Sequence, residues 1–382
     1  MRARPLLAAI PAAILSLSLT PAQAAPVATA PYVVTVRDGV SSTDAAAFAR
    51  GIGAEVTDVW SLAINGFAAR LTLAEVAALR ANPAIQLVEH DAVFGIAATQ
   101  TNLPNWGLDR VDQRSLPLSG SYTYTATGTG VKVYIVDSGI RFSHTQFGGR
   151  AISGTDAIDG GTADDCNGHG THVAGIAGGS TVGGAKTASI IAVRVLNCSG
   201  TGTLSQIVNG LNWTIADHAA GTPAVANMSL GAGANSTIDT AVNNTINDGI
   251  TVVVAAGNGN TGGVRQPACN YSPARVANAI TVGATTKTDA AASFSNYGSC
   301  VDWLAPGVEI LSSWHTGDTA GAYVDGTSQA APHVAGIAAQ YLQGNPTASP
   351  ATVRSALYTL TTKNVISNVG TGTPNALAYT NL

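Results

Sequence analysis

The sequence has few charged residues. Lys, Arg, Asp and Glu make up 10% of the 382 residues, well below the usual quarter, and the formal net charge is −4. Because only 18 residues are Lys or Arg, the chain lacks the basic character of a nucleic-acid-binding protein, and we expect no such partner. Beyond the first residues no apolar stretch is long enough to span a bilayer, so we expect no membrane anchor.

The first residues have the pattern of a secretory signal. Arg2 and Arg4 precede an apolar run over residues 6–19, and "PAQA" at 21–24 supplies the small residues of a cleavage site. The apolar run is too short for a transmembrane helix. We therefore expect residues 1–24 to be a signal peptide and the protein to be secreted into the extracellular medium.

Cysteine is also scarce, with four residues at positions 166, 198, 269 and 300. An even number in a secreted protein favours disulfide bonds. Three pairings of Cys166, Cys198, Cys269 and Cys300 are possible, and the sequential one closes two loops of roughly thirty residues, each stabilising by roughly 3–4 kcal/mol. A tetra-cysteine zinc site is the alternative, but no Cys-x-x-Cys pair supports it.

Residues 31–97 predict a small α/β unit. Apolar strand-like segments alternate with two helical segments in the order βαββαβ, which is typical of a ferredoxin-like fold. Asn65-Gly66 indicates a hairpin turn between the second and third strands. Thr72 and Glu75 have the spacing of a capping box at the start of the second helix.

From about residue 98 the pattern changes. Continuous apolar, β-branched runs alternate with helical stretches such as 203–219 and 236–248. The runs cover residues 131–137, 188–196, 223–230, 250–257 and 279–284. Buried runs of this kind predict an α/β fold with a doubly wound, mostly parallel sheet and helices on both faces. In such sheets active sites lie beyond the carboxyl ends of the strands.

Four polar residues stand at such positions. Asp137 ends the first run, His169 opens a Gly/Ala-rich helical stretch, Asn258 follows the fourth run, and Ser328 heads the stretch "SQAAPHVAG". Acyl transfer needs this combination. An imidazole takes the proton of a serine nucleophile, a buried carboxylate orients the imidazole, and amide donors stabilise the oxyanion.

Ser328 also has a simpler interpretation, because serine is a common N-cap residue. A helix beginning at Ser328 would instead direct its dipole and first amide groups toward a reacting centre. Pro332 is tolerated if it lies near the first turn, where amide donors have no intrahelical acceptor.

"VDSGI", "GHGTHVAG" and "GTSQAAPHVAG", in the order Asp, His, Ser, resemble the three signatures of the subtilisin-like serine proteases. The likeness covers residues 98–382. The cysteine spacing, "NYSPARVANAITVGAT" and "SFSNYGSCVDWLAPG" are similar to the proteinase K branch, close to aqualysin-type enzymes. Residues 25–97 are similar to the family's inhibitory propeptide, which is removed by self-cleavage. The resemblance implies a junction near Ala97 and Ala98.

The resemblance implies a role for each residue of the set. Asp137 orients, His169 is general base and acid, Ser328 is the nucleophile, and Asn258 donates to the oxyanion. His172 and His333 fall inside helical stretches, and we expect both to be structural.

The resemblance also places the substrate cleft. Two segments would pair with an extended peptide and a third would complete the pocket for the P1 side chain. They are Ser199, Gly200, Thr201 and Gly202; Ser229, Leu230 and Gly231; and Ala255, Ala256 and Gly257. Small residues there leave room for large apolar side chains, so we expect broad specificity with an apolar or aromatic P1 preference. An ordinary strand-to-loop exit is the alternative for residues 229–231.

Structural calcium is implied in the same way, and no catalytic metal. In the proteinase K branch one site uses two backbone carbonyls and an aspartate, matching Ala277, Ala279 and Asp302. A second candidate is "LDRVDQ", where Asp109, Asp112 and Gln113 supply hard oxygen ligands. Asp165 is a further candidate ligand, although exposed acids in loops are usually only solvated.

One residue departs from the family pattern. Gln329 follows Ser328, where the family usually has an oxidisable methionine. The sequence thus predicts a secreted, monomeric serine endopeptidase that acts on proteins and peptides, with its own propeptide as folding partner and inhibitor.

Two alternative functions have less support in the sequence. A catalytically silent binding protein on the same fold would not need all four residues. An esterase of the α/β-hydrolase type would need Gly-x-Ser-x-Gly and another residue order.

Overall fold

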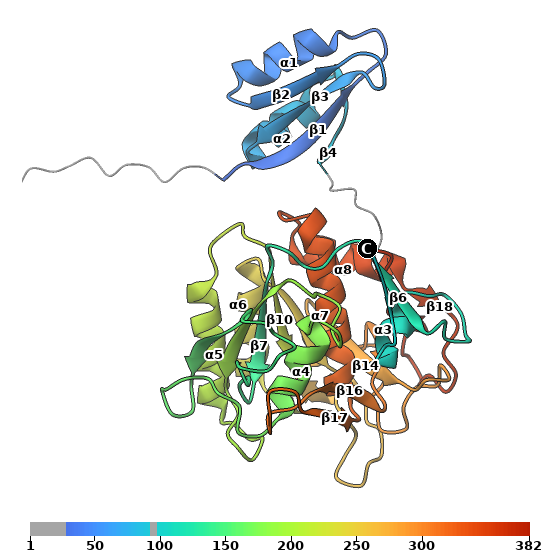
Figure 1. Cartoon of the computed structure of the whole chain (residues 1–382). Coiled ribbons are helices and arrows are strands. Elements are labelled where there is room, and N and C mark those ends of the chain that lie inside the picture. Colours follow the sequence, from blue (N-terminus) through green and yellow to red (C-terminus); the bar gives the residue numbers. More distant parts are fainter. Residues whose placement is uncertain (1–27, 92–97) are drawn as a thin grey trace, which may run out of the picture.

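The computed structural model describes residues 28–91 and 98–382, which form two units (Figure 1). The expected signal, residues 1–24, lies outside the described residues, and so do residues 92–97, which include Ala97 of the expected junction. Each unit has its own hydrophobic core. The separation of the cores agrees with the two-unit organisation inferred from the sequence.

The N-terminal unit is a four-stranded antiparallel sheet with two helices. The strand order is β2-β3-β1-β4. Its elements are β1 (Ala30–Val36), α1 (Ser42–Gly51), β2 (Glu55–Trp60), β3 (Gly66–Leu71), α2 (Leu73–Ala81) and β4 (Ile85–His90). The predicted βαββαβ order is confirmed, and so is the capping box of Thr72 and Glu75 at the start of α2.

The predicted hairpin between β2 and β3 is confirmed, but its turn is longer than the two residues Asn65-Gly66. Residues 61–65 connect β2 to β3, and Gly66 is the first residue of β3, paired with both Thr35 and Trp60. A Cβ atom at Gly66 would stand 2.2 Å from the carbonyl oxygen of Val34. The glycine is therefore needed for close strand approach, and not for a two-residue turn.

The C-terminal unit is built on a nine-stranded sheet in the order β18-β19-β15-β14-β12-β10-β7-β9-β8. All neighbouring pairs are parallel except β18 and β19. The strands are β7 (Lys132–Asp137), β8 (Ala151–Asp156), β9 (Ser189–Arg194), β10 (Ala224–Met228), β12 (Thr251–Ala255), β14 (Ile280–Thr285), β15 (Trp303–Pro306), β18 (Thr362–Lys363) and β19 (Ala376–Leu377).

The other elements of this unit are helices and short two-stranded pairs (Figure 1). The helices are α3 (Trp106–Val111), α4 (His169–Gly178), α5 (Leu204–Asp217), α6 (Ser236–Asn247), η1 (Ala268–Asn270), α7 (Thr327–Gly344) and α8 (Pro350–Leu360). The paired strands are β5 (Ala98–Thr101) with β6 (Ser121–Tyr124), β11 (Ala232–Gly233) with β13 (Tyr271–Ser272), and β16 (Ile310–Ser313) with β17 (Gly321–Val324).

The sheet is covered on both faces, as predicted. Val133 and Ile135 of β7 belong to a core that includes side chains of α4 and α7, whereas Tyr134 and Val136 belong to a second core with α5 and α6. Successive side chains of a strand point to opposite faces, so these two cores lie on the two sides of the sheet.

Four strands of the sheet escaped the sequence prediction, and two of them, β18 and β19, are only two residues long. β8 reads "AISGTD" and lies at the edge of the sheet, and β15 reads "WLAP" and is four residues long. Neither is a continuous apolar run of the length found in the five predicted strands. Strands β8 and β15 are held by pairing with a predicted neighbour, β9 and β14 respectively.

The four cysteines form two disulfide bonds, Cys166–Cys198 and Cys269–Cys300. The sequential pairing is therefore the one observed. The first bond joins the segment that precedes α4 to the loop that follows β9. It thus ties down the region from which His169 projects.

Hydrogen bonds between the two units converge on Thr347, in the connection between α7 and α8. Its hydroxyl lies 2.8 Å from His90 Nε2 and 3.5 Å from the Tyr32 hydroxyl. The 18 residues of α7 make a helix of about 27 Å, so this contact lies at the far end of α7 from Ser328.

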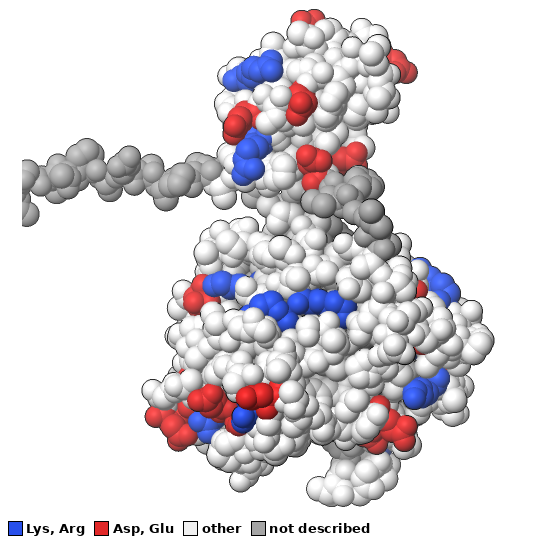
Figure 2. Space-filling view, viewed as in Figure 1, with Lys and Arg blue, Asp and Glu red and all other residues white. Residues whose placement is uncertain are grey.

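The face in Figure 2 is mostly uncharged, as the composition leads one to expect. Within residues 28–91 and 98–382, no helix is both long and apolar enough to cross a membrane.

Candidate active site

The predicted site residues gather at the carboxyl ends of neighbouring strands. Asp137 ends β7, residues 199–202 follow β9, residues 229–231 follow β10, and residues 255–257 follow β12. These strands are adjacent in the order β12-β10-β7-β9. Four segments that are far apart in the sequence therefore meet along one edge of the sheet.

Asp137 and His169 form the central pair. His169 Nδ1 lies 2.8 Å from Asp137 Oδ1 and 3.0 Å from Oδ2. The carboxylate side chain is fully buried, and the imidazole is 27% exposed. Burial favours the neutral ring, but the charge of Asp137 and its hydrogen bond outweigh this effect and raise the pKa of His169, with a smaller contribution from Asp165. His169 Nε2 makes no hydrogen bond to the described residues.

A residue not assigned to the site from the sequence, Ser138, helps to place His169. Its hydroxyl donates to Asp165 Oδ1 at 3.0 Å and accepts from the Gly170 N–H at 3.0 Å. Asp165 also accepts from the backbone N–H of Asn167, Gly168 and Thr171 and from the Thr171 hydroxyl. A carboxylate at this position caps the start of α4, where the helix dipole favours negative charge.

Ser328 is the second residue of α7, and its hydroxyl is not an N-cap. Gly326 is the N-cap residue, whereas Ser328 Oγ donates to the Ser229 carbonyl at 3.1 Å. In return, Ser229 Oγ donates to the Ser328 carbonyl at 2.8 Å. Among the described residues, no hydrogen bond joins Ser328 Oγ to His169.

Pro332 explains why the Ser328 carbonyl needs an external donor. In a regular helix this carbonyl would accept from the N–H of residue 332, which proline lacks. The N–H of Ala330 already donates to the Gly326 carbonyl, so Pro332 lies beyond the spare donors of the first turn, later than we expected. The Ser229 hydroxyl supplies the missing hydrogen bond and fixes the first turn of α7 to the end of β10.

Asn258 binds the other side of the same turn. Its Oδ1 accepts from the Thr327 N–H at 2.9 Å and from the Thr327 hydroxyl at 2.8 Å. This arrangement leaves the Asn258 amide group and the Ser328 N–H without an acceptor among the described residues. A Cβ atom at Gly326 would lie 3.2 Å from Asn258 Nδ2 and 3.5 Å from the Ser328 nitrogen. Two free donors therefore converge on space that only glycine leaves open.

The Asp137–His169 pair and the Ser229–Ser328 pair are brought together by the neighbouring strands β7 and β10. These strands are in parallel register, with Asn227 beside Ile135, so Ser229 stands level with Asp137. Ser229 holds the turn that carries Ser328, and Asp137 holds His169. A carboxylate, an imidazole, a hydroxyl and two amide donors thus share one edge of the sheet. The family model described as "Subtilase family" matches residues 128–376.

The chain belongs to the subtilase family.

Individual subtilases are similar over most of the chain. An extracellular serine proteinase from Thermus sp. (strain Rt41A) is 54% identical over 329 residues, which are 86% of this chain and 78% of that protein. The alkaline serine exoprotease A of Vibrio alginolyticus is 45% identical over 332 residues, 85% of this chain and 60% of the relative. The 329 aligned residues exceed the length of the C-terminal unit, so the similarity extends into the N-terminal segment.

A solved structure agrees with the fold. The crystal structure of a cold-adapted subtilisin-like serine proteinase matches with a TM-score of 0.68 and 47% sequence identity. The match covers 72% of this chain and 97% of that one. The subtilisin-like fold with a large, mostly parallel sheet is therefore established for this subtilase.

Two of the segments predicted to line a substrate cleft flank β7 at the catalytic edge of the sheet. Residues 199–202 form an exposed loop tied by Asn197, whose Oδ1 accepts from the N–H groups of Ser199 and Thr201. Residues 229–231 leave β10 on the opposite side of β7. The two segments therefore stand on either side of Asp137, separated by a gap of two strand spacings.

Asn296, which we did not single out from the sequence, shapes the third segment. Its amide group donates to the Ala256 carbonyl at 2.9 Å, and its Oδ1 accepts from the N–H groups of Gly259 and Gln266. Gly257 has a φ of 97°, and a Cβ atom there would stand 2.5 Å from Asn296 Nδ2. Asn296 thus holds the loop that presents Asn258.

His172 and His333, which we expected to be structural, are both buried. His172 Nε2 lies 3.1 and 2.9 Å from the carbonyl oxygens of Ile310 and Ala322, in β16 and β17. His333 Nδ1 lies 2.9 Å from the Gln329 carbonyl oxygen. Burial lowers the pKa of each to about 4, so both stay neutral over the ordinary pH range.

The candidate calcium ligands lie in two other regions. Ala277, Ala279 and Asp302 precede β14 and β15, at the amino end of the sheet, opposite to the catalytic edge. Asp109, Asp112 and Gln113 lie in and just after α3. Asp165, the further candidate, already accepts five hydrogen bonds from neighbouring groups.

Gln329 is buried beside the oxyanion donors. Gln329 is only 1% exposed, and neither its Nε2 nor its Oε1 has a hydrogen-bond partner among the described residues. A Cβ atom at Gly326 would lie 2.6 Å from Gln329 Oε1, which places the amide next to the donor pair. A substitution that changes the shape or polarity of residue 329 would therefore alter the surroundings of the two oxyanion donors.

Gln329→Met should make the protein sensitive to peroxide. A thioether in this position gains an oxygen on oxidation, and the enlarged side chain then crowds the donor pair. We expect casein hydrolysis by the variant to decline with peroxide dose while the parent keeps its rate. The buried Met228 serves as an internal reference for oxidation in both proteins. Equal inactivation of the parent and the variant would contradict this expectation.

Proposed function

We propose that this subtilase is a secreted serine endopeptidase that cleaves peptide bonds through an acyl-enzyme intermediate. The observation that carries the proposal is the Asp137–His169 pair at the same sheet edge as Ser328 and two free amide donors. The family match and the named serine proteinases among its relatives support the same reaction class.

Proton transfer begins at Ser328. A rotation about its side chain would break the bond to the Ser229 carbonyl and turn the hydroxyl toward His169 Nε2, which has no partner among the described residues. His169 then removes the proton as Ser328 Oγ attacks the substrate carbonyl, and later returns it to the leaving amine. Asp137 holds Nδ1–H and stabilises the imidazolium that forms.

The oxyanion of the tetrahedral intermediate would be held by Asn258 Nδ2 and the Ser328 N–H. Both donors are preorganised, because Asn258 Oδ1 is tied to Thr327 and the Ser328 N–H is fixed in the first turn of α7. The positive end of the α7 dipole points the same way. In other proteases, loss of one such donor lowers kcat by roughly 100- to 1,000-fold.

We propose that the substrates are proteins and peptides bound in extended form between residues 199–202 and 229–231. Backbone pairing of this kind is indifferent to sequence. Ala255, Ala256 and Gly257 present small side chains near Asn258, which leaves room for an apolar or aromatic P1 residue. Broad specificity with that preference follows, and we propose that the enzyme works as a monomer.

The pH dependence of kcat/KM tests the role of His169. The base must be neutral, and the pKa of His169 is raised, so activity should fall as the pH drops through a value above that of free imidazole. Asp137→Asn removes the carboxylate charge and hydrogen bond that raise the pKa of His169. It leaves the burial of the ring, which lowers that pKa. We expect the acid limb to move to lower pH, with kcat reduced roughly 10,000-fold.

His218→Gln is the matched control for that experiment. His218 Nδ1 also pairs with a carboxylate, Asp248, at 2.7 Å, but it lies outside the catalytic edge. Its variant should leave the acid limb where it is. An acid limb that stays in place in Asp137→Asn would mean that a group other than His169 controls the activity.

We propose further that residues 1–24 are a signal peptide and residues 25–97 an inhibitory propeptide removed by self-cleavage. The compact N-terminal unit and the reach of the Thermus alignment into it support this assignment. Folding help is useful here, because parallel sheets form slowly. In this structure the unit contacts Thr347, so inhibition of the cleft would require it to bind at the other end of α7.

Ser328→Ala should abolish processing. Without the nucleophile no acyl-enzyme forms, and the secreted product should retain the N-terminal unit when made in a protease-free host. N-terminal sequencing of the parent should start near Ala98, and the variant should run as the longer precursor on a denaturing gel. Normal maturation of the variant in that host would refute self-cleavage.

We also propose a structural calcium ion at Asp109, Asp112 and Gln113. Asp112 Oδ1 is buried without a partner among the described residues, and burial and the charge of Asp109 raise the pKa of Asp112 to about 6. Asp109 Oδ1 and Gln113 Oε1 both accept from the Ser119 N–H at 3.0 Å, so these two side chains converge. These are hard oxygen donors, which suit calcium. The positive charge of the ion would reduce the repulsion between the carboxylates of Asp109 and Asp112.

A further inference from the structure

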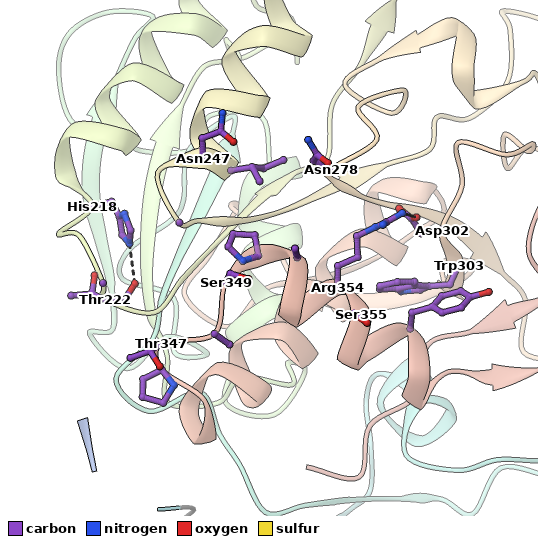
Figure 3. A pocket seen from close by; sticks show the side chains of 18 of the residues that line it. His218, Thr222, Asn247, Asn278, Asp302, Trp303, Thr347, Ser349, Arg354 and Ser355 are labelled. Atoms are coloured by element: carbon purple, nitrogen blue, oxygen red, sulfur yellow. Dashed lines mark hydrogen bonds and ion pairs between the residues drawn. The ribbon is translucent and has the colours of Figure 1, made fainter. Parts of the chain in front are cut away.

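A groove of about 920 Å³ lies at the amino edge of the main sheet (Figure 3). Its walls come from α8, the end of α6, the segments that precede β14 and β15, residues 218–222 and 346–349, and two residues of the N-terminal unit. Asp302 is the acid among its lining residues, and Arg354 is the base that faces it. The groove is separate from the catalytic edge, because it lies at the opposite ends of the strands.

Both carboxylate oxygens of Asp302 have partners within the chain. Arg354, in the second turn of α8, donates from Nη2 to Asp302 Oδ1. The Thr281 N–H donates to Asp302 Oδ2 at 2.8 Å, and the Asp302 N–H donates to the Thr281 carbonyl at 2.9 Å. Asp302 is thus fixed to β14 on one side and to α8 on the other.

The pair is partly desolvated. The Asp302 side chain is 14% exposed and that of Arg354 is 41% exposed. Burial raises the pKa of Asp302, against the Thr281 N–H and the charge of Arg354. Arg354 Nε is buried without a partner among the described residues, and Asp302 is the carboxylate that pairs with this guanidinium, through Nη2. A buried carboxylate needs a positive neighbour of this kind.

The sequence resemblance assigns Asp302 to a calcium ion, together with the carbonyl groups of Ala277 and Ala279. Calcium needs six to eight oxygen ligands, and Asp302 would be the charged one among these three. Within the described residues, no group of three or more His, Cys, Asp or Glu is suited to hold a metal. A divalent ion on the same carboxylate would stand beside the guanidinium and be repelled by it. The residues present therefore do not fit an ion while Arg354 is in place.

We propose that the Arg354 guanidinium takes the place of a calcium ion at Asp302. The chain itself then carries the positive charge that joins α8 to β14 and β15, and this position binds no metal. The second candidate site, at Asp109, Asp112 and Gln113, differs because a carboxylate oxygen there is left without a partner. The proposal concerns the fold alone and does not depend on the proposed peptidase activity.

Counting calcium ions per chain tests the proposal. The full-length protein is made with Ser328→Ala, so that self-digestion cannot blur the count, and bound calcium is measured by equilibrium dialysis with the radioactive ion. Arg354→Ala in this background should bind one calcium more than the parent, because it frees Asp302. Asp302→Asn alone should leave the parent count unchanged.

Three further variants serve as controls. Arg354→Lys keeps the positive charge and should bind as many calcium ions as the parent. The double variant Arg354→Ala with Asp302→Asn should also bind the parent number, because it lacks the freed carboxylate. Lys132→Ala frees Asp217 from an ion pair of similar exposure and should add no ion. An unchanged count in Arg354→Ala would overturn the proposal. Loss of one ion in Asp302→Asn would also overturn it, and this result is decisive even if Arg354→Ala does not fold.

Discussion

A buried carboxylate paired with an imidazole sets the requirements for the rest of the site. Asp137 is fully buried, and such a charge is tolerated only when hydrogen bonds satisfy it, here from the Ser138 N–H and from His169 Nδ1. His169 must therefore be held at a fixed position, which Ser138 and Asp165 achieve by capping the start of α4. The same rigidity keeps His169 Nε2 available for chemistry.

The carboxyl and amino edges of the sheet differ in how their polar groups are paired. At the carboxyl edge, strand ends and the starts of α4 and α7 leave donors and acceptors without partners. At the amino edge, Asp302 is closed by Thr281 and Arg354. The helix α7 joins the two edges, because Ser328 stands at its beginning and the connection with Thr347 follows its end.

Patterns local in sequence predicted much of this molecule. The five apolar runs became β7, β9, β10, β12 and β14, and the four polar residues lie on one sheet edge because parallel strands end together. The strands β8 and β15 were missed because they depend on a neighbour for pairing. Ser138, Asn296 and Arg354 were missed for a similar reason. Their partners are loops or strands many residues away, and no spacing rule connects them.

Covalent labelling tests the central claim most directly. A serine-directed phosphonate should react with one residue of the mature protein, and mass spectrometry should find the adduct on Ser328. The account predicts that the labelling rate collapses in His169→Ala, because nothing else is placed to take the serine proton. An adduct on another residue, or an undiminished rate in His169→Ala, would contradict the account.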